Sequence, residues 1–164
     1  MTLLTPLAMP DPDVRPGYLD LLALIERLHR LMLDVIKDEF ERLGQLDLNA
    51  VQALLLYNIG DQELSAGELR SRGYYQGSNV SYNLKKLVES GYMHHERSDV
   101  DRRAVRVRLT EKGQTLRNQV AGLFARHVDM IDRRRSPTPD QMAEATQTLR
   151  RLERFWAGQI RYIY

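Results

Sequence analysis

The chain has 164 residues, of which 43% are hydrophobic and 28% charged, with a formal net charge of +2, so it can bury one substantial core. Its six prolines and ten glycines are too few for a fibrous or disordered chain. No apolar run approaches the ~18 residues of a membrane span, and the absence of cysteine excludes disulfides, thiol redox sensing and thiolate metal sites.

The N-terminal part of the chain predicts an arm followed by a long helix. Residues 1–17 contain prolines and lack the basic flank of a signal peptide, so we expect a flexible arm on a cytoplasmic protein. From residue 18 to Gly44, apolar side chains recur at three- and four-residue steps, which predicts one helix. Leu24 and Leu31 widen its apolar stripe beyond what one neighbouring helix covers, which favours contact with a second copy of the chain.

Capping patterns define the next two predicted helices. Asn49 and Gln52 have the spacing of a capping box, and we expect the helix that follows them to end at Gly60. Ser65 and Glu68 repeat the capping-box spacing at the start of a short helix. A further helix follows after a tight turn, and two short helices joined in this way predict a helix-turn-helix.

The second helix of this motif, within residues 76–91, has one apolar and one polar face. In a helix-turn-helix the polar N-terminal part of this helix enters the major groove, where amide, hydroxyl and ammonium groups contact bases and phosphates. For the helix in isolation, a role in capping and solvation is an equally good interpretation. The predicted DNA contacts are Gln76, Ser78, Asn79, Tyr82, Asn83, Lys85 and Lys86.

Residues 92–109 predict a two-stranded ribbon with a charged connection. Apolar Val105, Val107 and Leu109 alternate with arginines in its second half, as in a strand with one buried face. Directly after a recognition-helix candidate, such a ribbon is typical of the wing of a winged helix. Its predicted DNA contacts are Arg102, Arg103 and Arg106, and Asp99 and Asp101 are predicted to orient the arginine side chains.

The charge distribution supports a polyanion partner for this segment. From residue 64 to residue 112 there are ten basic and six acidic residues, so the segment carries +4 and the remainder of the chain −2. Basic character concentrated in one lobe is expected of a nucleic-acid-binding protein.

Two more helices are predicted at the C-terminus. Thr110 can cap a helix that continues to the basic run Arg133–Arg135, where Pro137 interrupts it. The last helix has a clear start, with Thr138 as N-cap and Gln141 in the capping-box position. Its apolar and aromatic side chains are more than a single chain would leave in water, which again favours a second copy.

The run from residue 65 to residue 113 resembles the MarR family of bacterial winged-helix transcriptional regulators. The resemblance is carried by NVSYNLKKLVESGYMHHERSDVDRRAVRVRLTEKG, in which D-x-D-R-R and LTEKG are similar to the family's wing and helix-start patterns. It extends to the long flanking helices. The resemblance implies a mainly α fold with a small β-wing, a winged helix-turn-helix flanked by long dimerisation helices, and effectors that are often phenolic or other aromatic acids.

Residues and resemblance together predict a homodimeric DNA-binding transcriptional regulator. We expect a 1–17 arm and a single MarR-like domain over 18–164, in which 18–44 and 114–164 dimerise and 46–113 form the winged-helix lobe. A two-fold dimer would place its recognition helices roughly 34 Å apart, on a pseudo-palindromic operator in double-stranded DNA. We expect a cytoplasmic, nucleoid-associated protein without cofactor, modulated by a small aromatic or anionic effector or acting without any ligand.

The sequence leaves few alternatives. It has no nucleophile elbow, phosphate-binding glycine loop or His-Glu-x-x-His pair, so we do not expect an enzyme. His94 and His95 are neighbours on a predicted strand and would point to opposite faces, which disfavours a shared metal. The alternative function is a winged-helix protein–protein interaction module without sequence-specific DNA binding.

Overall fold

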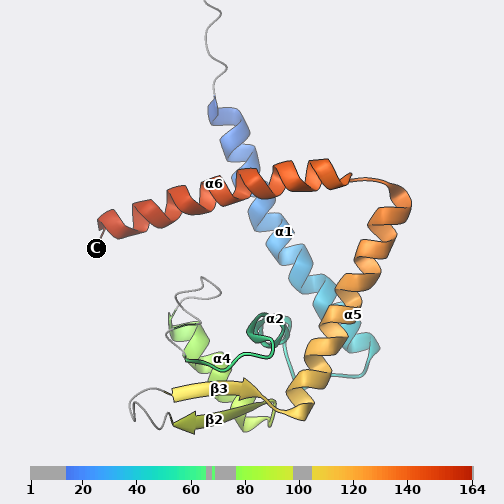
Figure 1. Cartoon of the computed structure of the whole chain (residues 1–164), viewed down its shortest axis with the longest axis vertical. Helices are drawn as coiled ribbons and strands as arrows, with labels where there is room; N and C mark the ends of the chain where they lie inside the picture. Colours follow the sequence, from blue (N-terminus) through green and yellow to red (C-terminus); the bar gives the residue numbers. More distant parts are fainter. Residues whose placement is uncertain (1–13, 66–67, 69–76, 98–104, 164) are drawn as a thin grey trace, which may run out of the picture.

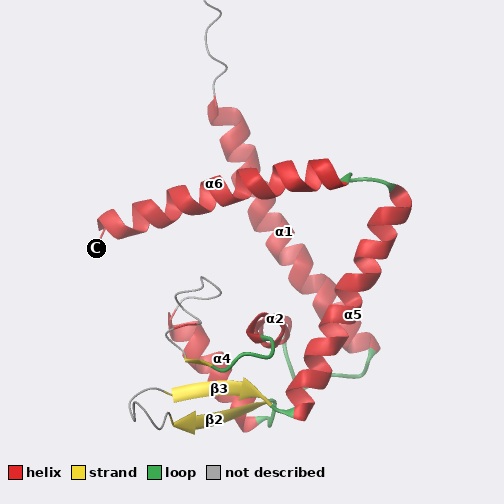
Figure 2. Cartoon of the chain, in the orientation of Figure 1, coloured by secondary structure: helices red, strands yellow, loops and turns green. Residues whose placement is uncertain are grey.

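The computed structural model describes residues 14–65, 68, 77–97 and 105–163. Its elements, labelled in Figure 1, are the helices α1 (Val14–Arg42), α2 (Ala50–Ile59), α4 (Gly77–Glu89), α5 (Glu111–Arg134) and α6 (Pro139–Ile163), and the strands β1 (Leu64–Ser65), β2 (Met93–Arg97) and β3 (Val105–Leu109). Helices predominate, and the strands form one small sheet (Figure 2), which confirms the predicted mainly α fold with a small β-wing. None of the helices in this part of the chain has the length and apolar content of a membrane span.

The elements gather into a small lobe and an open frame of long helices. Figure 1 shows α2, α4 and the sheet at one end, beside the C-terminal part of α1 and the start of α5. At the other end α6 crosses α1, where the Trp156 Nε1–H donates a hydrogen bond to the Tyr18 hydroxyl at 3.2 Å. None of the described side chains of α6 is buried. The small lobe therefore shares one core with the C-terminal part of α1 and the first half of α5, whereas α6 has little support from its own chain.

Helix α1 begins at Val14, four residues before the predicted start. Pro16 lies in its first turn, where the backbone N–H that proline lacks would have no partner within the helix, so the proline is compatible with helix. Its buried side chains, Ile36 and Phe40, lie in its C-terminal part. The rest of the helix leaves much of its apolar stripe exposed.

Helix α2 lies at the centre of the core. Its predicted capping box is confirmed, since the Gln52 N–H donates to Asn49 Oδ1 at 2.9 Å and the Asn49 N–H to Gln52 Oε1 at 3.2 Å. The helix is apolar on most of its surface because several elements cover it. The buried side chains around it include Ile36, Phe40, Leu55, Leu56, Ile59, Leu64, Leu87, Met93, Val107, Leu116 and Val120.

The sheet is three-stranded and antiparallel, in the order β1-β3-β2, so the predicted two-stranded ribbon was incomplete. Strand β1 pairs Leu64 with Val107, and both side chains are buried. A strand of two residues is too short to show alternation in the sequence, which explains why it was missed. Ser65 also forms the predicted capping box with Glu68, and the rest of the predicted short helix lies outside the described residues.

The predicted starts of α5 and α6 are confirmed by their caps. Thr110 Oγ1 accepts a hydrogen bond from the Gly113 N–H at 3.1 Å. The Thr138 N–H donates to Gln141 Oε1 at 2.9 Å, and the Gln141 N–H donates to Thr138 Oγ1 at 3.3 Å. Gly113 lies so close to the chain before β2 that a Cβ atom on it would be 2.1 Å from the Tyr92 carbonyl oxygen. Only glycine fits this position.

Replacing Gly113 with alanine is therefore expected to destabilise the fold. The new methyl group would push the Tyr92 backbone away from Thr110, at a cost of about 2 to 3 kcal/mol. Urea unfolding followed by circular dichroism measures this loss. Gly122→Ala is the matched control, because it lies in the same helix and its Cβ would meet only the Arg126 guanidinium at 3.7 Å. That variant should keep its stability or gain up to about 1 kcal/mol, and equal losses in both variants would contradict the close approach.

Glu39 of α1 contacts two arginines, Arg42 on the same helix and Arg126 on α5, and the second contact connects the two helices. Glu39 accepts hydrogen bonds from Arg42 Nε at 3.0 Å and from Arg126 NH2 at 2.5 Å, and its side chain is 10% exposed. The Arg42 hydrogen bond, with further help from Arg126, lowers the pKa of the Glu39 carboxyl below its ordinary value of 4.5, although burial opposes the shift. The ionised form is therefore the one that the folded state stabilises.

We expect the Glu39 contact to depend on pH. Because the folded pKa lies below 4.5, the contribution to the free energy of unfolding is present above pH 4.5 and is lost as the pH falls through the folded value. Glu39→Gln should cost about 1 to 2 kcal/mol near neutral pH and much less at pH 3. Thermal melting between pH 3 and 7 measures both. Glu26→Gln, which removes an exposed partner of Arg30, should change stability by less than about 0.5 kcal/mol, whereas a pH-independent loss in Glu39→Gln would contradict this explanation.

Candidate nucleic-acid interface

Helix α4 is held to the core by one face and by its C-terminal end. Leu84 and Leu87 are 7% and 0% exposed and pack into the core. Gly91 ends the helix in a left-handed conformation with φ +76°, and the Tyr92 N–H donates to the Leu87 carbonyl at 2.9 Å. The chain therefore turns from α4 into the sheet over the three residues 90–92, and the outer face of α4 stays in solvent.

The predicted DNA contacts at residues 76–86 differ in where the structure places them. Tyr82 is 60% exposed, and the side chains of Lys85 and Lys86 are 74% and 47% exposed, so all three point outward. Ser78 and Asn79 lie in the first turn of α4, which is the position that the prediction requires. Gln76 lies outside the described residues.

Asn83 differs from the prediction. It is only 8% exposed, because it lies four residues before Leu87 and therefore shares the inner side of the helix with that buried leucine. Direct contact with a base requires an accessible amide, so this position does not fit the predicted role.

Both lysines of α4 lie close to Glu89. Lys86 Nζ is 3.1 Å from Glu89 Oε2 and Lys85 Nζ is 3.8 Å from Glu89 Oε1. The hydrogen bond to Glu89 raises the pKa of Lys86, which keeps this side chain charged. Exposed ion pairs contribute little free energy, about 0 to 1 kcal/mol each, so either lysine can exchange Glu89 for a phosphate at small cost.

The sheet presents arginines on its outer side. Arg106 and Arg108 are exposed while Val107 between them is 2% exposed, which confirms the predicted alternation in β3. Arg106 is opposite Glu96 of β2 and Ser65 of β1 in the strand register. The predicted wing residues Asp99, Asp101, Arg102 and Arg103 lie outside the described part of the chain.

A cavity separates α4 from the sheet. It has a volume of about 330 Å³ and is lined on the helix side by Leu84, Lys85 and Val88 and on the sheet side by His95 and Val107. Lys85 lines this cavity and is also 74% exposed, so it lies at the edge of the outer face of α4, next to the sheet. His94, in contrast, pairs with Arg108, and across the described residues no three His, Asp or Glu side chains are grouped to hold a metal ion.

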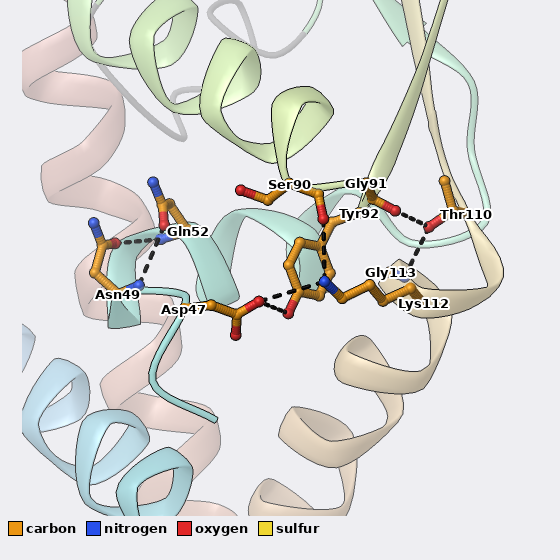
Figure 3. Close-up of polar contacts among 9 residues, drawn as sticks. All are labelled: Asp47, Asn49, Gln52, Ser90, Gly91, Tyr92, Thr110, Lys112 and Gly113. Carbon is orange, nitrogen blue, oxygen red and sulfur yellow. Dashed lines mark hydrogen bonds and ion pairs between the residues drawn. The ribbon is translucent and has the colours of Figure 1, made fainter. Parts of the chain in front are cut away.

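Four residues that the sequence did not identify as a group meet where α4, the sheet and α5 join (Figure 3). We call Asp47, Tyr92, Thr110 and Lys112 the Tyr92 cluster. The Tyr92 hydroxyl donates to Asp47 Oδ2 at 2.7 Å, and Lys112 Nζ lies 3.4 Å from the same oxygen and 4.0 Å from the centre of the Tyr92 ring. The Thr110 side chain donates to the Gly91 carbonyl at 2.8 Å.

The ionisation of this cluster is well defined. Burial and, next, the hydrogen bond to Asp47 raise the pKa of the Tyr92 phenol. The same hydrogen bond from Tyr92, with a smaller contribution from Lys112, lowers the pKa of the Asp47 carboxyl. At neutral pH the phenol is therefore a donor and the carboxylate an acceptor. Within the sequence, the only signal for the cluster was the LTEKG run, which places Thr110 and Lys112 together but says nothing of Asp47.

Comparison with known proteins agrees with this arrangement. The model of the winged helix DNA-binding domain family matches residues 48–113, which contain α2, α4 and the sheet. The chain is also 38% identical over 148 residues to the exopolysaccharide II synthesis transcriptional activator ExpG of Rhizobium meliloti (strain 1021), an alignment that covers 88% of this chain and 74% of that protein.

Solved structures share the whole fold. A MarR transcriptional regulator from Methanosarcina mazei Go1 is 24% identical with a TM-score of 0.66, and the match covers 85% of this chain and 96% of that chain. FabT from Streptococcus pneumoniae, solved in complex with DNA, is 19% identical with a TM-score of 0.65, and covers 87% of this chain and 99% of that one. The long helices are therefore part of the shared architecture, together with the winged-helix lobe.

Proposed function

Because the chain belongs to the MarR family of winged-helix transcriptional regulators, we propose that it acts as a homodimer on a pseudo-palindromic operator. The observation that supports this best is the two-sided nature of α4. Its inner face, with Leu84 and Leu87, is fixed in the core, while Tyr82, Lys85 and Lys86 point into solvent from the opposite side. A helix held in this way can enter the major groove without exposing the core.

The proposed DNA contacts divide between groove and wing. Ser78, Asn79 and Tyr82 have side chains that donate and accept hydrogen bonds, which suits base edges, whereas Lys85 and Lys86 suit phosphates. Gln76 belongs to the same groove set, and we leave Asn83 out of it because of its burial. At the wing we propose contacts by Arg102, Arg103 and Arg106, with Asp99 and Asp101 orienting the arginines.

The proposed dimer uses the long helices 18–44 and 114–164, with 46–113 as the DNA-binding lobe. Large apolar side chains remain exposed on these helices, and a groove of about 710 Å³ lies between α1 and α6, lined by residues such as Ile25, Leu149 and Trp156. The exposed set includes Leu19, Leu24, Leu28, Leu31, Val128, Met142, Leu149, Phe155 and Ile160. A second copy related by a two-fold axis would cover this surface and would bring two α4 helices onto successive half-sites, roughly 34 Å apart.

We propose that such a regulator acts in the cytoplasm at the nucleoid and that a small aromatic or anionic effector adjusts its DNA affinity. The cavity between α4 and the sheet supports an aromatic effector because Leu84, Val88 and Val107 form apolar walls, while Lys85 and Glu89 supply one charge of each sign. A ligand there alters DNA binding only if it binds one orientation of α4 more tightly than another.

A second candidate function is a winged helix that binds only protein. The exposed Tyr82 on α4 would also suit a protein interface, so this alternative rests on the same surface. The two functions differ in their dependence on salt. Contact with DNA releases counterions and weakens steeply as salt rises, whereas a protein contact of this size does not require such a slope.

Neutralising the lysines of α4 tests the DNA function. A duplex selected from random DNA with the wild-type protein serves as the operator, and fluorescence anisotropy over a salt series gives affinity and slope. In Lys85→Gln with Lys86→Gln the slope of log K against log salt should fall by about 0.9 for each lost phosphate contact. Lys37→Gln is the matched control, because it removes one exposed charge from α1, where Lys37 pairs with Glu41.

The control variant should bind the operator with nearly the wild-type slope. If selection yields no preferred duplex and no variant changes the slope, the protein-binding function replaces the proposed one. A lysine variant with an unchanged slope on a tightly bound operator would contradict the placement of α4 in the groove.

A charge on the exposed apolar surface tests the dimer. Phe155 is 54% exposed on α6, and Phe155→Glu should weaken self-association at least about 100-fold, because an unpaired carboxylate would be buried in the interface. Sedimentation equilibrium measures the association constant. Leu46→Glu is the control, since Leu46 is 78% exposed but lies between α1 and α2. Equal association of both variants would contradict an interface on α6.

A further inference from the structure

We propose that Tyr92 is a positioning residue for DNA recognition, because its hydroxyl contact with Asp47 fixes the orientation of α4 relative to α1. This inference rests on the proposed function and extends it to residues that do not touch DNA. It predicts that Tyr92 and Asp47 determine which half-site spacing the dimer accepts.

Hydrogen bonds attach the chain after the C-terminal end of α4 to the start of α5. Three consecutive carbonyl oxygens, those of Ser90, Gly91 and Tyr92, each accept a hydrogen bond from Thr110, which joins β3 to α5, or from Lys112 in the first turn of α5. The donors are Lys112 Nζ at 3.1 Å, Thr110 Oγ1 at 2.8 Å and the Thr110 N–H at 3.1 Å. These three residues directly follow Glu89, the last residue of α4, so the bonds tie the chain that leaves α4 to the start of α5.

The Tyr92 side chain connects this attachment to the segment that follows α1. Tyr92 is 1% exposed, so its hydroxyl requires a partner, and that partner is Asp47 in the connection that follows α1. Lys112 covers the Tyr92 ring and approaches the same Asp47 oxygen, which places it between the end of α4 and the end of α1 (Figure 3). Tyr92 and Asp47 are 45 positions apart in the chain. This contact therefore links the recognition helix directly to the connection leaving the helix that we propose to dimerise.

The length of α4 converts a small tilt at its C-terminal end into a large displacement of its first turn. Helix α4 has 13 residues, so its two ends lie about 18 Å apart at ~1.5 Å per residue. A tilt of about 5° at the Tyr92 end moves the first turn by roughly 1.6 Å for a helix of that length. Hydrogen bonds to bases tolerate only a few tenths of an ångström, about 2.7 to 3.2 Å between heavy atoms. A small change at Tyr92 is thus enough to misplace Ser78 and Asn79.

The chain offers a matched contact that does not reach α4. Asp61, after the end of α2, accepts hydrogen bonds from Gln114 Nε2 at 2.8 Å and Arg117 NH1 at 3.1 Å, both on α5. Like Asp47, it is a largely exposed aspartate that connects an interhelical segment to the N-terminal part of α5. Asp61→Asn therefore controls for the loss of such a contact in general.

The test compares Tyr92→Phe, Asp47→Asn, the double variant and Asp61→Asn with the wild-type protein. Tyr92→Phe keeps the ring and changes no charge, so direct electrostatic effects on DNA are absent. The probes are the duplex selected with the wild-type protein, the same duplex with its centre one base pair longer or shorter, and a scrambled duplex. Anisotropy titrations give four affinities for each protein, and thermal melting confirms that each variant is folded at the titration temperature.

We expect Tyr92→Phe and Asp47→Asn to reduce the preference for the selected spacing by about three- to tenfold, with binding to the scrambled duplex within about twofold of wild type. The double variant should lose no more preference than either single variant, since both changes break one contact. Asp61→Asn should keep the wild-type preference.

Two results would overturn the inference while leaving the proposed function intact. In one, the wild-type protein prefers its selected duplex but Tyr92→Phe and Asp47→Asn keep the full spacing preference. In the other, each variant loses affinity for all four duplexes by the same factor, as a merely structural role would predict. A wild-type protein that prefers no duplex overturns the proposed function, and the inference with it.

Discussion

The attachment of α4 at Tyr92 is the constraint on which the rest of the DNA-binding lobe depends. The backbone of Tyr92 is bonded to Leu87 on one side and to Thr110 on the other, and its side chain is buried against Lys112. Gly113 must be glycine for this approach to occur. Helix α4 is fixed at Tyr92 and by the buried side chains of Leu84 and Leu87. The core therefore does not determine which residues occupy the opposite face, and these can be side chains suited to DNA contact.

Features determined by residues close in sequence were predictable. Each capping box joins residues three apart, and Asn49 with Gln52 and Thr138 with Gln141 form the hydrogen bonds that their spacing indicates. The alternation in β3 and the apolar face of α4 also follow from local periodicity. The MarR-like sequence between residues 65 and 113 predicted the fold class for the same reason, because its turns, caps and strands are encoded within short stretches.

Features that depend on distant residues were not predictable from one sequence. Strand β1 has two residues and is defined only by its pairing with Val107. Nothing in the residues around Asp47 indicates that Tyr92 lies next to it. Asn83 was predicted to contact DNA because its amide suits a base edge, whereas its neighbours in the fold leave it only 8% exposed, on the side of Leu87. In each case the tertiary neighbours, rather than the local pattern, decide the role of the residue.

The winged-helix lobe is joined to the long helices by its apolar core, to which α1 contributes Ile36 and Phe40 and α5 contributes Leu116 and Val120, and also by polar contacts around that core. Besides the packing of Ile36 and Phe40, α1 makes a polar contact with α5 through Glu39 and Arg126. The segment that follows α1 contacts the lobe through Asp47 and Tyr92. Polar contacts of this kind contribute about 1 kcal/mol each, whereas burial of a large apolar side chain contributes about 2 to 3 kcal/mol. One of these polar contacts can therefore be lost while the shared core keeps the lobe folded against α1. In the proposed dimer built on α1 and α6, the orientation of α4 relative to α1 would set the distance between the two α4 helices, so the proposal predicts that these polar contacts, together with the core, adjust DNA affinity.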